Sequence, residues 1–154
     1  LKELPPSFGC LLSLKQLLLH GCQELKRLPD SFALLTQLTE LEISKCGIQE
    51  LPDLMEMNNL KRLRVRDCPL RELPFKEESA PRRKRKRRAT EKGLIRLWRL
   101  ELYCTEVREV SFPEGVCINL QTLSIMCCND LVKVGSLPAT LEYLNLRGCG
   151  VLGK

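Results

Sequence analysis

Residues 14–32 read LKQLLLHGCQELKRLPDSF, and the spacing of leucines in this stretch recurs along the whole chain. The pattern L-x-x-L-x-L, with Ile or Val as its last member in three copies, starts at residues 14, 38, 60, 97, 120 and 141. Eight residues after each start stands Cys22, Cys46, Cys68, Thr105, Cys128 or Cys149. Self-similarity at a period of 21 to 24 residues, lengthened once to 37, indicates a repeat protein.

The L-x-L core of each unit predicts a short β-strand with two aliphatic side chains on one face, because side chains alternate along a strand. One unit alone cannot bury these side chains, whereas stacked units bury them against each other. We therefore predict an α/β solenoid: a curved right-handed array with short parallel strands on its concave face and a mostly irregular convex side.

The remainder of each unit predicts how the chain returns to the next strand. A small residue at the cysteine position ends the strand, and its side chain can bond neighbouring backbone groups. The steps Leu28-Pro29, Leu51-Pro52 and Leu73-Pro74 follow. Proline lacks an N–H and restricts the residue before it, which favours an extended return along the convex side.

The motifs LKELPPSFGCLLSLKQLLLHGCQELKRLPDSF (1–32) and LEYLNLRGC (141–149) resemble leucine-rich repeat proteins, specifically the plant disease-resistance type. This resemblance implies the recognition domain of an intracellular innate-immunity receptor, which binds a pathogen-derived or host protein and restrains a neighbouring nucleotide-binding domain. Two alternatives stay open: the substrate-recognition repeats of a ubiquitin ligase, and a nuclear scaffold protein.

Residues 1–154 are expected to form a single domain of about six repeats. The first 13 residues match the second half of a unit, and the last unit stops soon after Cys149, so we expect truncation at both ends. The phosphate-binding motif G-x-x-x-x-G-K-[ST] is absent, so the nucleotide-binding part of the resembled receptors is not in this sequence.

Residues 76–93 lengthen one return and hold the whole net charge of +6, which leaves the rest of the chain neutral. The run comprises Arg82, Arg83, Lys84, Arg85, Lys86, Arg87 and Arg88. Like charges without apolar partners predict a disordered insertion that loops out of the solenoid. The run is a candidate nuclear-import signal. A plain solvated loop is the alternative, and nucleic-acid binding is not expected because no aromatic residue interleaves the run.

Several other functions are disfavoured by what the sequence contains. No apolar run reaches 18 residues, which excludes a membrane span. Nine cysteines without a C-x-x-C pair, and a single histidine, His20, do not suit a zinc site, and we expect no cofactor. An odd number of cysteines without a signal peptide favours a reducing compartment, cytoplasmic or nuclear. We expect no enzymatic activity.

The remaining candidate site is the concave face, where side chains between the strand leucines point outward. They vary on a constant scaffold, which is how repeat arrays build binding surfaces. The predicted partner-binding stripe consists of Arg62, Arg64, Arg66, Arg99, Glu101, Tyr103, Met126, Tyr143 and Arg147. The competing interpretation is self-neutralisation, because pairing in register would place Arg64 between Glu42 and Glu101.

Overall fold

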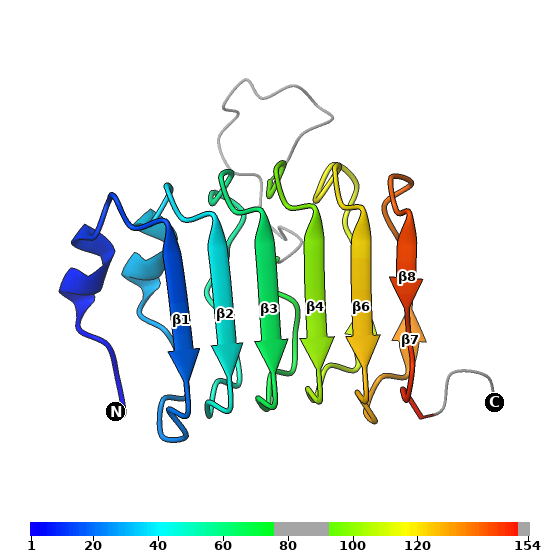
Figure 1. Ribbon diagram of the computed structural model, residues 1–154, viewed down its shortest axis with the longest axis horizontal. Helices are drawn as coiled ribbons and strands as arrows, with labels where there is room; N and C mark the ends of the chain where they lie inside the picture. Colours follow the sequence, from blue (N-terminus) through cyan, green and yellow to red (C-terminus); the bar gives the residue numbers. More distant parts are fainter. Residues whose placement is uncertain (76–92, 151–154) are drawn as a thin grey trace.

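A computed structural model describes residues 1–75 and 93–150, and its main element is a parallel sheet with the strand order β1-β2-β3-β4-β6-β8. The strands are β1 (Gln16–His20), β2 (Glu40–Ser44), β3 (Arg62–Arg66), β4 (Arg99–Tyr103), β6 (Thr122–Met126) and β8 (Tyr143–Asn145). They stand side by side in chain order, and the returns run behind them (Figure 1). Each predicted unit therefore contributes one strand, and the predicted solenoid is confirmed.

The core lies between the sheet and the returns. Leu41, Leu63, Leu100 and Leu123 follow one another across the sheet, and each is at most 1% exposed. At the two sides of the sheet the equivalent leucines are less covered, and Leu144 on β8 is 44% exposed. A strand with one neighbour buries less of its apolar surface than a strand with two.

A left-handed residue follows each strand. The positive φ angles are 74° at Gly21, 52° at Lys45, 51° at Asp67, 50° at Cys104, 54° at Cys127 and 71° at Gly148. In the first five of these turns the N–H of this residue donates to a carbonyl of the next unit, as Lys45 does to Arg66 at 3.0 Å. This turn brings the following cysteine or threonine inward.

The residue after each turn confirms the predicted role of the small side chain. The Sγ of Cys46 donates to the carbonyl of Ser44 at 3.3 Å, and the Sγ of Cys68 donates to the carbonyl of Arg66 at 3.1 Å. Thr105 is buried, and its hydroxyl lies 3.2 Å from the Sγ of Cys128. Threonine thus fills the cysteine position with a bond to the neighbouring unit.

The returns take different forms along the array. Two are 3₁₀-helices, η1 (Pro6–Cys10) and η2 (Asp30–Leu34), whose Phe8 and Phe32 rings stack at 6.3 Å. Two others pair as short parallel strands, β5 (Glu109–Val110) and β7 (Lys133–Val134). Helical structure in the described residues is therefore limited to these two 3₁₀ segments.

The predicted insertion falls almost wholly on residues 76–92, outside the described residues. Its last member, Gly93, belongs to the folded part, because it is buried and forms a parallel bridge with Val116. A Cβ at this glycine would lie 2.6 Å from the carbonyl oxygen of Met55, so the backbone approaches the neighbouring return closely. The array then continues with Leu94 and Leu97, both fully buried.

Candidate functional site

The face of the sheet opposite the returns, here called the open face, carries three rows of side chains set by the strand register. The first row is Gln16, Glu40, Arg62, Arg99, Thr122 and Tyr143. The second row is Leu18, Glu42, Arg64, Glu101, Ser124 and Asn145. The third row is His20, Ser44, Arg66, Tyr103 and Met126, and it continues to Arg147. Every residue of the predicted stripe thus lies in one of these rows.

Arg147 follows β8 by two residues, and its place in the third row comes from the backbone ladder. The N–H of Cys127 donates to the carbonyl of Arg147 at 2.9 Å. One unit earlier, the N–H of Cys104 donates to the carbonyl of Met126 at 3.0 Å in the same way. Arg147 is therefore the counterpart of Met126 in the last unit.

The second row is held together by ion pairs at its centre. Arg64 lies between two carboxylates, with its Nη1 3.4 Å from Glu42 and its Nε 2.6 Å from Glu101. Arg99 adds a contact of 3.0 Å from its Nη2 to Glu101. The sequence-based expectation that Arg64 pairs with both neighbours is confirmed, so these two arginines and two glutamates neutralise each other.

The ionisation of this cluster follows from its contacts. Partial burial alone would raise the pKa of Glu101, but hydrogen bonds from Arg64 and Arg99 outweigh it, and the pKa lies below its ordinary value. The hydrogen bond to Glu101 raises the pKa of Arg64 despite the opposing effect of burial. Both groups are charged at neutral pH.

Arginines of the first and third rows stack on aromatic rings instead. The guanidinium carbon of Arg62 lies 5.2 Å from the centre of the Trp98 ring, and that of Arg66 lies 5.5 Å from the Tyr103 ring. Such cation–π contacts hold a guanidinium in place and leave its N–H groups available to a ligand. Trp98 directly precedes β4, and the Arg62 guanidinium lies over its ring.

The stripe residues near β8 form a polar group. The side-chain amide of Asn145 contacts the Sδ of Met126 at 3.3 Å and the hydroxyl of Tyr143 at 3.4 Å. Tyr143 and Arg147 are exposed, and Met126 is half-buried. The open face therefore offers aromatic, thioether and guanidinium groups close together at this side.

Charge on the open face is uneven between its rows. Once the ion pairs of the second row are set aside, three arginines, Arg62, Arg66 and Arg147, stand against one glutamate, Glu40. Glu40 accepts a hydrogen bond from Gln16 at 3.3 Å. The remaining positive charge is thus carried by side chains that keep free N–H groups.

Other chemistry on the described residues is sparse. The Nδ1 of His20 lies 2.7 Å from the hydroxyl of Ser44, and both side chains sit on the sheet surface rather than in a pocket. No group of three or more potential metal ligands occurs among residues 1–75 and 93–150. The nine cysteines, all within the described ranges, are free thiols. No helix in the described part of the chain has the length and apolar character needed to cross a bilayer.

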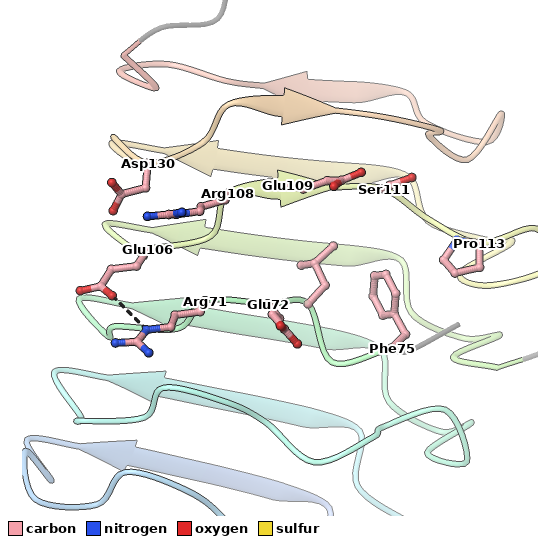
Figure 2. A pocket seen from close by; sticks show the side chains of 10 residues that line it. Arg71, Glu72, Phe75, Glu106, Arg108, Glu109, Ser111, Pro113 and Asp130 are labelled. Carbon is pink, nitrogen blue, oxygen red and sulfur yellow. Dashed lines mark ion pairs between the residues drawn. The ribbon is translucent and has the colours of Figure 1, made fainter. Parts of the chain in front are cut away.

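A groove of about 920 Å³ lies on the return side, between the third and fourth units (Figure 2). Leu73 and Phe75 line its apolar part. Its charged rim includes the ion pair of Arg71 and Glu106 at 3.5 Å, drawn as a dashed line in Figure 2. Sequence reasoning missed this groove, because the leucine spacing does not fix how the irregular parts of neighbouring returns pack against each other.

Known structures with the same arrangement identify the fold. The leucine-rich repeat domain of the type III effector XopL matches with a TM-score of 0.69 and 25% identity, over 97% of this chain and 49% of that one. The chain folds as a leucine-rich repeat domain. The leucine-rich repeat protein LIC12759 of Leptospira interrogans matches this domain with a TM-score of 0.59 and 22% identity, over 94% of the chain and 40% of its own length.

Sequence comparison connects the leucine-rich repeat domain to a plant protein. A protein of Arabidopsis thaliana whose name describes it as a disease resistance protein, At4g19050, is 38% identical over 71 residues. The match covers 45% of this chain and 6% of that protein, so the chain spans a small part of its relative's length. No protein-family model matches the chain. The domain therefore resembles plant resistance proteins in part of its sequence.

Proposed function

We propose that this leucine-rich repeat domain is the protein-recognition module of an intracellular plant innate-immunity receptor, and that its open face binds the partner. The single observation that carries the proposal is the contrast between the faces of one sheet. The inward face is uniformly aliphatic, whereas the outward face presents the exposed guanidinium groups of Arg62, Arg66 and Arg147 beside the half-buried Tyr103 ring. Arginine, tyrosine and methionine are enriched in interface cores.

The immune role draws its support from sequence. The motifs of the first 32 residues resemble plant resistance proteins, and an Arabidopsis protein named for disease resistance is similar over 71 residues. In such a receptor the partner is a pathogen-derived or host protein, or the neighbouring nucleotide-binding domain. Nine free thiols suit a reducing compartment.

The test of the open face compares two sets of substitutions in plant cells. One variant changes Arg62, Arg64, Arg66 and Tyr103 to Ala. The matched control changes Arg27, Arg71 and Arg108, exposed arginines on the return side, and removes the same positive charge. We expect proteins that co-purify with the wild-type domain, quantified by mass spectrometry, to be lost from the first variant and kept by the control. Equal losses from both would contradict recognition through the open face.

The full-length transcript tests the receptor class. An upstream P-loop in the same reading frame supports the immune receptor, whereas an F-box or a catalytic cysteine domain would place the repeats in a ubiquitin ligase. The measurement is independent of the open face, so either part of the proposal can fail alone.

The run from residue 82 to residue 88 is the proposed nuclear-import signal of the same protein. Replacing it with Gly and Ser should keep a fluorescent fusion out of the nucleus, because import receptors need the basic run. A fusion that enters the nucleus equally well without the run would overturn this part of the proposal.

A further inference from the structure

The third row of the open face, from Arg66 through Tyr103 and Met126 to Arg147, has an order that suggests a ligand. Two exposed arginines stand at its ends, and two half-buried side chains that offer apolar surface stand between them. Arg66, Tyr103 and Met126 lie on the neighbouring strands β3, β4 and β6, and Arg147 continues the row just after β8, so the four residues form a line that runs across the strands.

We propose that this line, here called the Arg–Tyr–Met–Arg row, binds an extended acidic segment of the partner in which carboxylates at positions i and i+4 flank an apolar side chain at i+2. The proposal rests on the open face being the recognition surface and adds which chemical pattern that surface selects.

The spacing of the row sets this pattern. Neighbouring strands lie about 4.8 Å apart, so the three steps from Arg66 to Arg147 span about 14 Å. An extended segment advances about 3.4 Å per residue, so positions i and i+4 are also separated by about 14 Å. Positions i, i+2 and i+4 of such a segment point to the same side. The side chain at i+2 then falls midway, between Tyr103 and Met126.

The electrostatics of the face favour carboxylates at the two ends of the row. The cationic groups of Arg66 and Arg147 have no carboxylate partner among the described residues, whereas Arg64 in the second row is held by Glu42 and Glu101. Arginine and carboxylate form paired, charge-assisted hydrogen bonds. A basic segment would meet the positive charge of two arginines at these ends, and the row itself contains no acidic side chain.

The row is also partly ordered before a ligand binds. Arg66 stacks on the Tyr103 ring at 5.5 Å, and Met126 is contacted by the Asn145 amide at 3.3 Å. Side chains that are already positioned lose less conformational freedom on binding. The central pair can therefore accept a Leu or Ile side chain without rearranging the sheet.

The experiment uses the 154-residue chain and synthetic peptides in calorimetric titrations. The matched peptide is acetyl-Gly-Ser-Glu-Ser-Leu-Ser-Glu-Ser-Gly-amide, and the register control has the same composition with the two Glu residues three positions apart. We expect the control to bind at least tenfold more weakly than the matched peptide. Arg66→Glu and Arg147→Glu should each weaken the matched peptide at least tenfold, whereas Arg27→Glu on the return side should change its affinity less than twofold.

A charge exchange provides the sharper arm of the test. Arg147→Glu should restore binding of a peptide in which the Glu at i+4 is replaced by Lys, a result that general loss of fold cannot produce. Equal affinity for the two registers, absence of this rescue, or no binding of the matched peptide at millimolar concentration would overturn the proposal. The proposed recognition function has its own test. If the peptide results are negative but the loss of co-purified proteins still follows substitutions on the open face, only the acidic-segment proposal is wrong. If co-purification does not depend on the open face, the recognition function itself is wrong.

Discussion

The turns that follow the strands are alike in all six described units, whereas the returns behind the sheet differ from unit to unit. Each turn has a left-handed residue followed by a small residue, Cys or Thr. The returns after Pro5 and Pro29 form 3₁₀-helices, but those with Ser111 and Gly135 at the equivalent position pair as β5 and β7. The N–H of Gly135 donates to the carbonyl of Val110 at 2.8 Å, which a proline could not do. This backbone donor is thus used where β7 pairs with β5 and is missing where proline precedes a 3₁₀-helix, whereas the return after Pro52 forms neither element.

The largest expected effect comes from a substitution in a turn, the part that is alike in all six units. Gly47 follows Cys46 in the turn after β2, and a Cβ there would lie 2.1 Å from the carbonyl oxygen of Gln23. Because the backbone of the preceding turn must move to make room for the methyl group, Gly47→Ala should lower the free energy of unfolding by about 3 kcal/mol. Urea denaturation measures this.

The control for this substitution is Gly21→Ala in the preceding turn. A Cβ at Gly21 meets nothing within 4 Å, but its φ of +74° is unfavourable for alanine. The loss should be limited to about 1 kcal/mol. Equal losses for the two variants would mean that the turns tolerate closer packing than their geometry indicates.

A smaller effect on stability is expected from a substitution in a return, the part that differs from unit to unit. Gly135→Pro removes the N–H that pairs β7 with β5 and should cost about 2 kcal/mol, because the Val110 carbonyl loses its donor. Gly135→Ala keeps the donor and brings a Cβ within 2.7 Å of the Ser111 hydroxyl oxygen, a side chain that can move aside. The Gly135→Pro variant should therefore melt at a lower temperature than the Gly135→Ala variant. The reverse order of melting temperatures would contradict the stabilising role assigned to this hydrogen bond.

The strands could be predicted from the sequence, whereas the structure of the returns could be predicted only in part. The L-x-x-L-x-L spacing predicted the strands and their register, including Arg64 between Glu42 and Glu101, because alternation and period fix both. It did not predict β5 and β7, since two-residue strands leave no periodic signal.

For the open face, the sequence predicted which side chains point outward but not which contacts they make. Every predicted stripe residue lies in one of the three rows. The stacking of Arg62 on Trp98 depends on side-chain rotamers that a repeat pattern does not encode. The partner-binding role assigned to the stripe stays a prediction.

A gain in stability should come from Lys45, the exposed left-handed residue after β2. Its φ of +52° is costly for a lysine and acceptable for a glycine. Lys45→Gly should raise the free energy of unfolding by about 0.5 kcal/mol, since the flexibility of glycine in the unfolded chain offsets part of the gain. Asp67→Gly should gain less, because aspartate tolerates this conformation better. A loss of stability at position 45 in urea titrations would argue against strain in these turns.

The smallest response is expected from thiols enclosed by the fold. Burial raises the pKa of Cys117 to about 12, and burial chiefly raises that of Cys68 to about 11. Because the thiolate is the reactive form, both should resist iodoacetamide at pH 8 in the folded protein, whereas exposed Cys10 should be labelled. Mass spectrometry of tryptic peptides reads the labelling, with urea-unfolded protein as the reference. Rapid labelling of Cys117 without denaturant would mean that its surroundings open readily.

The sequence separation across the β3–β4 boundary has a consequence for the order of folding. Contacts between neighbouring units elsewhere join residues about 20 to 25 positions apart, but Arg64 and Glu101 are 37 apart. Closing the longer loop costs about 0.4 kcal/mol more in chain entropy. Arg64–Glu101, Arg62–Trp98 and Arg66–Tyr103 all cross this boundary. We therefore expect the three units on either side to form first and to join last at the boundary, where these contacts offset the longer closure.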